Sequence, residues 1–252
     1  YNTSGTYTDE SLAYLFNNAS QANGRQNGKA VYNNVKGLFQ LKDGYYVYDS
    51  YGSNGSNGNY AVYNSTTNSF DVYDKAGVYK GDASKETNLG QFFPFDSASK
   101  VFDENGNNLS PKKIVDGSTD LNHHFGMSMT TEFVQPARGK TTKNEDMVFE
   151  FSGDDDVWVY IDGVLVGDLG GIHEKATLKI NFATGAVHVG HVDNANDPEK
   201  TIQNTTIKEM FKAAGADTTN FSGSTFRDST KHTLSFFYLE RGAGASNMSL
   251  KF

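Results

Sequence analysis

The sequence predicts an all-β protein, an antiparallel β-sandwich with an elaborated N-terminal β-meander and one or two short helices. Three observations favour this fold. Short apolar stretches recur along the chain, turn residues separate them, and aromatic residues reach 13% although all hydrophobic residues make up only 37%. A chain of 252 residues is within the range of one sandwich domain. We therefore expect a single domain, in which residues 1–90 form an extension packed on the sandwich and residues 91–252 form its core.

The N-terminal third contains one helix signal and several strand signals. Within residues 1–20, a Thr-Asp cap precedes apolar residues at helical spacing. The stretches rich in Tyr and Val lie at residues 44–51, 60–63 and 70–74. Turn residues separate them, which predicts an antiparallel meander. The Tyr side chains have two open roles, core packing or exposed platforms on which sugar rings stack.

The strand pattern is strongest in the second half of the chain. The predicted strands lie at residues 125–134, 147–153, 157–166, 176–189, 232–242 and 247–252. Alternation in the second of these places Met147, Phe149 and Phe151 on one face. The Asp162-Gly163 step predicts a tight hairpin turn. One helix is expected at residues 206–214, where apolar residues recur at helical spacing.

Charge and composition exclude several classes of partner. The net charge of -8 disfavours nucleic acids and anionic membranes, and it suits a neutral sugar or a bound cation. The absence of cysteine removes disulfides and thiolate metal sites. No apolar run reaches the roughly 18 residues of a membrane span, so we expect no membrane insertion. Because the chain opens at Tyr1 with no signal peptide, we interpret it as a mature fragment of a larger protein.

The densest chemistry is an acidic turn, Gly153-Asp154-Asp155-Asp156, between two predicted strands. Three adjacent carboxylates repel one another, and a cation among them relieves that repulsion. Calcium suits such a loop because it takes about six to eight oxygen ligands in tolerant geometry. The alternative is a surface turn in which each Asp is solvated or caps a backbone donor. Trp158, the only Trp, follows two positions after the turn and is a further candidate for ligand binding.

Several longer motifs carry a resemblance to a known family. They are FFPFDS (92–97), NHHFGMSM (122–129), EDMVFEFSG (145–153), GDDDVWVYIDGVLVGDLGGIH (153–173), INFATG (180–185) and FFYLERGAGASN (236–247). Together they resemble the fibro-slime domain of bacterial surface proteins, a relative of the protective-antigen-type (flocculin-like) lectin domains. The motifs recur in the expected order over about residues 90–252.

The resemblance implies a protective-antigen-type sandwich in which consecutive Asp residues hold calcium, often across a cis peptide, and the ion binds vicinal sugar hydroxyls. The family's pair falls on Asp154 and Asp155. Asp156 stands where many lectin relatives have Gly, a departure that could alter the loop or add a ligand. A second loop supplies an Asn in those relatives, and Asn247 is the counterpart here. Asp168 and His173, in a Gly-rich loop, could reach a ligand or support the calcium loop.

Catalysis is not expected. A glycosidase needs two carboxylates about 5–10 Å apart, whereas the acids of the turn are adjacent. The sequence has no nucleophile elbow, zinc-protease helix or P-loop. We expect a non-enzymatic, calcium-assisted module that binds a neutral polysaccharide such as a glucan, within a larger bacterial cell-surface or secreted protein. The alternative is an architectural adhesin module with structural calcium and no glycan.

Overall fold

Antiparallel strands dominate the protein. The computed structural model describes residues 13–16, 30–51, 58–74, 77–80, 88–97, 102–105, 108–111, 114–115, 121–171, 173, 175–192, 197–241 and 246–252. Helices are few and short in this part of the chain, so the prediction of an all-β fold is confirmed. Among those helices, none has the length and hydropathy to cross a membrane.

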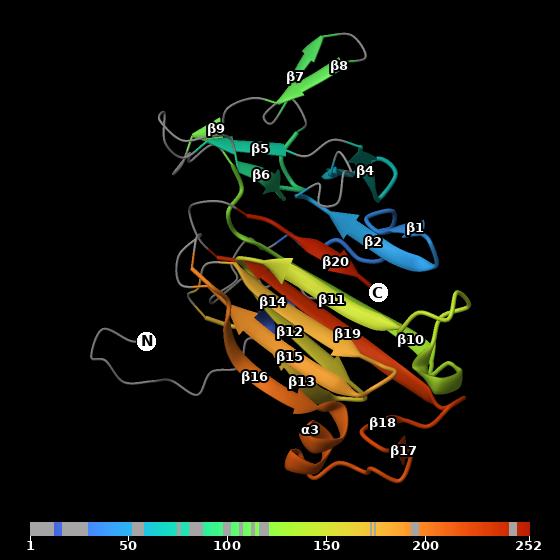
Figure 1. Ribbon diagram of the computed structural model, residues 1–252. Helices are drawn as coiled ribbons and strands as arrows, with labels where there is room; N and C mark the ends of the chain where they lie inside the picture. The colour runs from blue at the N-terminus through green and yellow to red at the C-terminus, as the bar shows by residue number, and fades with distance from the viewer. Residues whose placement is uncertain are drawn as a thin grey trace.

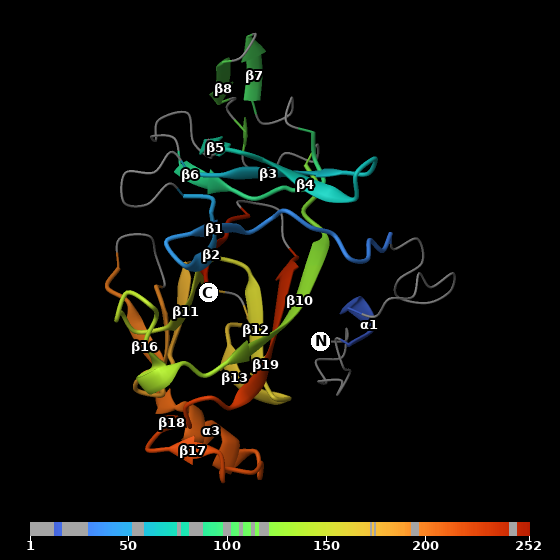
Figure 2. The same ribbon diagram turned by 90° about the vertical axis from the view of Figure 1, so that its right-hand side faces the viewer.

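Two antiparallel sheets form the body of the molecule (Figure 1). The larger sheet has seven strands, in the order β1 (Gln40–Lys42), β2 (Tyr45–Asp49), β20 (Ser249–Lys251), β11 (Val148–Gly153), β14 (Ala176–Asn181), β15 (Ala186–His191) and β16 (Lys200–Thr206). The smaller sheet has four, in the order β10 (Phe125–Val134), β19 (Lys231–Glu240), β12 (Asp156–Ile161) and β13 (Val164–Asp168). Figure 2 shows the two sheets face to face, with β11 and β16 on one side and β10, β12 and β19 on the other.

Aromatic rings fill the space between the sheets. The Phe236 ring lies 6.1 Å from that of Phe149 and 6.0 Å from that of Phe151, measured between centroids, and these pairs join the two sheets. Both β11 rings are buried, and Met147 packs against the same core. The predicted shared face is therefore confirmed. Burying one such ring contributes about 1.5–3 kcal/mol, so a few large rings offset the low aliphatic content.

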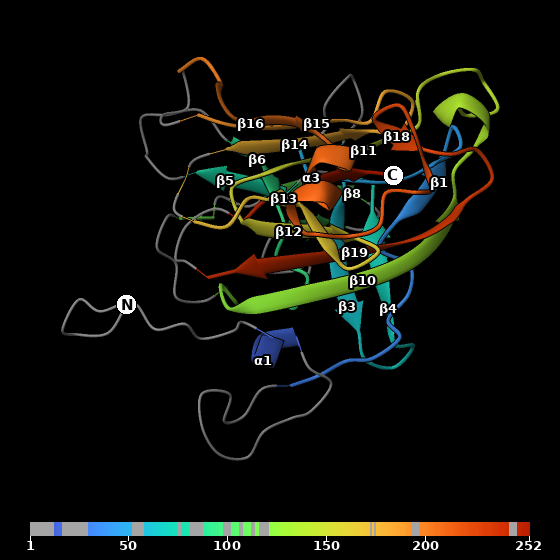
Figure 3. The same cartoon turned by 90° about the horizontal axis from the view of Figure 1, so that it is seen from below.

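The strands β10 and β19 form the longest ladder. Their register runs from Phe125 opposite Glu240 to Val134 opposite Lys231 without interruption. β10 is an edge strand of its sheet, and the short helix α1 (Ala13–Phe16) lies beside it (Figure 3). The bounds of β10 coincide with the predicted strand at residues 125–134.

The predicted N-terminal meander is wrong as one continuous sheet. Its three strands exist, but β2 pairs with β20, from the far end of the chain, and not with the next strand. The remaining strands form small sheets: β3 (Tyr60–Asn64) with β4 (Ser69–Tyr73); β5 (Gly77–Lys80) with β6 (Asn88–Gln91) and β9 (Ile114–Val115); and β7 (Phe102–Asn105) with β8 (Asn108–Pro111). The β3–β4, β5–β6 and β7–β8 pairs join consecutive strands, whereas the β2–β20 and β5–β9 pairings join strands far apart in the chain, which the local pattern does not encode.

The second helix and the tight turn have the expected chemistry. The helix α3 (Ile207–Ala213) begins after Thr206, whose Oγ1 accepts the backbone N–H of Glu209 at 3.2 Å. It lies near the short hairpin of β17 (Phe221–Ser222) and β18 (Thr225–Phe226) (Figure 1). Asp162 and Gly163 have φ values of 50° and 81°, as a two-residue hairpin turn with two left-handed positions requires. The cap predicted within residues 1–12 lies outside the described residues.

Candidate functional site

The acidic turn carries the chain from one sheet to the other. β11 ends at Gly153 in the larger sheet and β12 begins at Asp156 in the smaller one, so Asp154 and Asp155 alone make the crossing. Gly153 is needed because a Cβ there would lie 2.6 Å from the carbonyl oxygen of Asn247. The peptide bond between the two Asp residues is trans, as are all those in the described part of the chain. The cis peptide that the family resemblance implied is therefore not present.

The β11–β20 register places Asn247 opposite Asp154. Ser152 pairs with Ser249, and two further steps along both chains reach these residues. Asn247 Oδ1 accepts the backbone N–H of Asp154 at 3.1 Å and the hydroxyl of Tyr51. The backbone N–H of Asn247 donates to Asp155 Oδ2 at 3.2 Å. One asparagine thus contacts both carboxylate residues of the crossing.

The β12–β19 register places Glu240 opposite Asp155. Asp156 pairs with Leu239, and one further step reaches this acidic pair. Because side chains alternate along β19, Glu240 and Tyr238 both face the space between the sheets. The Tyr238 hydroxyl donates to Asp155 Oδ2 and also lies 3.0 Å from Ser246 Oγ. Asp155 therefore accepts hydrogen bonds from two segments that meet at the end of the core.

Burial raises the pKa of both carboxyl groups of the crossing. Asp155 is 7% exposed, and its pKa is raised well above the usual value, first by burial and then by Glu240 and Asp154. The pKa of Asp154 is raised to about 7, chiefly by burial and also by the charge of Glu240, while hydrogen bonds from Asn247 and Asp155 lower it. Unlike a solvated surface turn, this crossing holds its acids where their negative charge is destabilising.

The donor set of the crossing fits a hard cation. Asp154 Oδ1 is buried and has no hydrogen-bond partner within the described residues. Such an atom is destabilising unless something positive contacts it. Asp154, Asp155 and Asn247 offer only oxygen ligands, the type calcium prefers. Among the described residues, no three carboxylate, imidazole or thiolate groups have the spacing of a preformed metal cluster, so a cation here needs amide or backbone oxygens as well.

The chain has relatives among known proteins, which it matches over part of its length. The chain is similar to proteins of Dictyostelium discoideum. It is 37% identical to protein psiB over 109 residues, 34% identical to psiE over 129 residues, and 42% identical to psiI over 93 residues. These alignments cover 42%, 51% and 37% of this chain, but only 17%, 21% and 11% of the relatives. No protein-family model and no solved structure matches the chain.

Asp156 has a different environment from its two neighbours. It is the first residue of β12, and alternation turns its side chain to the outer face, away from Asp155. Both of its carboxylate oxygens contact the Arg241 guanidinium, through Nε and Nη2. Asp156 Oδ1 also accepts the backbone N–H of Gly171 at 2.9 Å. Asp156 thus binds Arg241 at the end of β19 through a bidentate ion pair and the loop after β13 through the Gly171 N–H.

The other candidate residues lie in β12, at the end of β13 and in the loop that follows β13. Trp158 packs against the ring of Phe16. It lies opposite Phe237 in the β12–β19 register and opposite Asp168 in the β12–β13 register. Asp168 Oδ1 accepts the backbone N–H of Gly170 at 2.9 Å. His173 Nε2 lies 2.8 Å from the carbonyl oxygen of Leu169. These contacts stabilise the loop after β13. None of them joins Trp158, Asp168 or His173 to Asp154 or Asp155.

Sequence reasoning missed Tyr51, Tyr238, Glu240 and Arg241. A signal existed for two of them, because the alternation in residues 232–236, continued along the strand, places positions 238 and 240 on the inner face. An acid on an inner face is unusual and indicates a buried polar site. The partner of that acid depends on strand order and register, which the sequence alone did not supply.

Proposed function

We propose that this chain is a non-enzymatic, calcium-assisted carbohydrate-binding module of a secreted or cell-surface protein. The fold we propose for it is the protective-antigen-type sandwich that the fibro-slime resemblance implies, and a bacterial source stays a prediction. The observation that carries the proposal is the crossing itself: two consecutive Asp residues, mostly withdrawn from water, next to Asn247. The printed names of the relatives say nothing of a ligand.

Asp154, Asp155 and Asn247 would hold the cation. Calcium, when bound, supplies positive charge and open coordination positions that sugar hydroxyls can occupy. The hydrogen bonds from Tyr238 and Asn247 orient the Asp155 carboxylate, and the Asp154 amide orients the Asn247 side chain. These contacts keep the oxygen ligands in place before an ion arrives, which lowers the entropic cost of binding.

The proposed ligand is a neutral polysaccharide such as a glucan. A net charge of -8 repels strongly anionic glycans, and the acids of the crossing add to that repulsion. The proposal excludes glycosidase chemistry because Asp154 and Asp155 are adjacent and share one buried network, whereas hydrolysis needs two separated carboxylates with distinct environments.

Affinity electrophoresis on a panel of neutral polysaccharides, with calcium and with a chelator, tests the proposal. We expect retardation on at least one polysaccharide that is lost on chelation and in Asp154→Ala and Asp155→Ala. The matched control is Asp217→Ala, since Asp217 is exposed in the loop after α3 and far from the crossing along the chain. Unchanged retardation after chelation and in both variants would overturn the calcium-assisted mechanism.

An architectural module with structural calcium is the second candidate. The dense network of Asp155, Tyr238 and Ser246 favours it, because such a network can fasten the two sheets together without any glycan. In that case chelation lowers the melting temperature while no polysaccharide in the panel binds. Release of reducing ends from any polysaccharide would contradict both candidates.

A further inference from the structure

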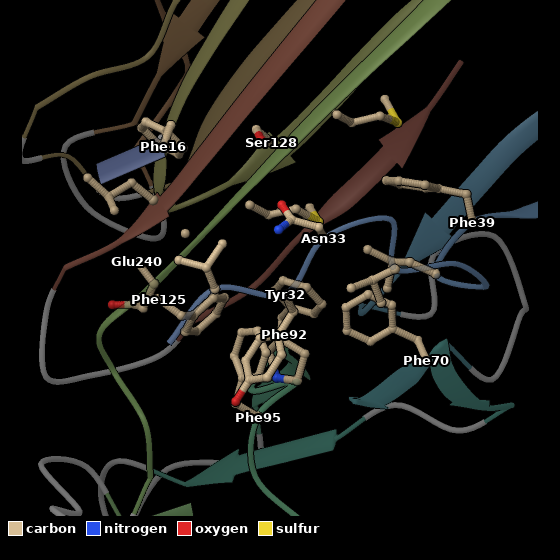
Figure 4. Close-up of a pocket in the computed structure, with 18 of the residues that line it drawn as sticks. Phe16, Tyr32, Asn33, Phe39, Phe70, Phe92, Phe95, Phe125, Ser128 and Glu240 are labelled. Atoms are coloured by element: carbon tan, nitrogen blue, oxygen red, sulfur yellow. The ribbon is translucent and has the colours of Figure 1, made fainter. Parts of the chain in front are cut away.

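A large groove opens beside the edge of the smaller sheet. It lies between residues 30–39 and β10, encloses about 1300 Å³, and is called the β10 groove below (Figure 4). Figure 4 shows Tyr32, Asn33 and Phe39 on one wall and Ser128 of β10 on the other. Drug-sized ligands fill pockets of about 300–1000 Å³, so this volume suits a longer ligand.

Aromatic rings are accessible in the β10 groove. Tyr32 is 46% exposed and Tyr46 is 56% exposed, although both are large aromatic residues that line it. Phe39 and Phe70 also line the groove and are only partly buried. A sugar presents C–H groups on the faces of its ring, and these pack against the negative face of an aromatic ring.

The polar lining of the β10 groove is almost entirely neutral. Asn33, Asn122 and Ser128 supply amide and hydroxyl groups that can both donate and accept hydrogen bonds. Among the described residues that line the groove, Glu240 and Arg241 are charged, and the others are uncharged when histidine is neutral. Exposed rings mixed with neutral hydrogen-bonding groups match a polyhydroxylated ligand better than a phosphate or an acyl chain.

The β10 groove reaches the strand end beside the acidic crossing, because Leu239, Glu240 and Arg241 line it and Leu239 pairs with Asp156. Tyr32 stacks on Phe95, with ring centroids 5.7 Å apart. Phe95 contacts Phe125, which stacks on Tyr238 at 5.9 Å. Tyr238 is the residue whose hydroxyl donates to Asp155, and Glu240, opposite Asp155, lines the groove. A row of rings packed in the core, with Tyr238 fully buried, therefore connects the wall of the groove to the proposed cation site.

We infer that the β10 groove is an extended subsite for a neutral polysaccharide, one end of which is held at the Asp154–Asp155 crossing. This inference rests on the proposed function, since it assigns to the same site a ligand longer than one sugar. Tyr32 and Tyr46 stack on successive sugar units, and the neutral amides contact their hydroxyls. The affinity of the module therefore rises with the length of the oligosaccharide.

Calorimetric titration with neutral oligosaccharides of increasing length, drawn from the polysaccharide that binds, tests the inference in the presence of calcium. In Tyr32→Ala and Tyr46→Ala we expect long chains to bind about two- to tenfold more weakly and short chains to bind unchanged. The matched control is Leu41→Ala. Leu41 is 65% exposed and pairs with Tyr46 across β1 and β2, but it is not a lining residue of the groove.

The outcomes separate the inference from the proposed function. Equal affinity of both Tyr variants and the unmodified protein for long chains overturns the inference and leaves the calcium site intact. If the unmodified protein binds long chains equally well without calcium, and the Tyr variants bind them more weakly, the groove is supported and the role of the ion is overturned. If the unmodified protein binds no oligosaccharide of any length, both are overturned.

Discussion

Asn247 Oδ1 accepts the backbone N–H of Asp154 at 3.1 Å, which joins two residues 93 positions apart in the chain. The contact lies at the end of the core where the chain passes from the larger sheet to the smaller one. Asp154 follows β11 and Asn247 precedes β20, and both strands belong to the larger sheet. It also places a neutral oxygen ligand beside the buried Asp155 and the half-buried Asp154. One hydrogen bond therefore serves both the fold and the proposed cation site.

Asn247→Ala leaves the Asp154 N–H without its acceptor, and we expect the free energy of unfolding to fall by about 1–3 kcal/mol. Urea denaturation in the presence of a chelator measures this as a lower midpoint with an unchanged slope. Asn220→Ala is the control, since Asn220 is exposed. Equal midpoints for the two variants would show that the contact contributes nothing.

Stability without calcium should decrease as the pH rises. The pKa of Asp154 is about 7 in the folded protein, mainly because of burial, against roughly 3.9 in an unfolded chain. A raised pKa means that the folded state binds the proton more tightly, so its contribution is complete below about pH 4 and is lost as the pH rises through 7. Melting temperatures at pH 5 and pH 8 measure the effect.

Calcium should reduce that pH dependence, because the ion stabilises the ionised carboxylate at pH 8 and competes with the proton at pH 5. Asp154→Asn should also weaken the dependence of the melting temperature on pH, since an amide does not titrate. A variant whose melting temperature changes with pH as steeply as that of the unmodified protein would assign the dependence to other groups.

Gly153→Ala should push the end of β11 away from Asn247, the residue two positions before β20. The added Cβ would lie 2.6 Å from the Asn247 carbonyl oxygen and 2.8 Å from the Phe151 ring, so the backbone must shift. We expect a loss of about 1–3 kcal/mol and a smaller rise in melting temperature on adding calcium. In Gly44→Ala the Cβ meets nothing within 4 Å, so the rise with calcium should be retained despite the strain of its φ of +89°.

Local patterns predicted the elements of this fold far better than their partners. The strand at residues 125–134 was found to the residue because apolar and small or polar side chains alternate along most of it. β16 was missed because Lys200–Thr206 is an edge strand with mostly polar, exposed residues. The pairing of β2 with β20 joins residues 47–49 to residues 249–251, and no local signal encodes it.

The same distinction applies to the candidate site. Asp154 and Asp155 were recognised because adjacent acids between two strands are conspicuous in sequence. Glu240 was missed because its importance depends on the β12–β19 register, which sets it opposite Asp155. Asp156 looked equivalent to its neighbours, but strand alternation turns it outward to Arg241.

Asp162 can stabilise the hairpin in two ways, through the positive φ of the turn or through the charge of its carboxylate beside His232. Asp162 has a φ of 50°, and its carboxylate contacts His232 Nδ1 at 2.6 Å and accepts the Thr233 N–H at 2.8 Å. If turn chemistry dominates, Asp162→Asn should cost under about 1 kcal/mol, because Asn tolerates a positive φ and keeps an acceptor. Asp162→Ala should cost about 2–3 kcal/mol, because it loses both. Equal losses in chemical denaturation would instead assign the stability to the negative charge beside His232.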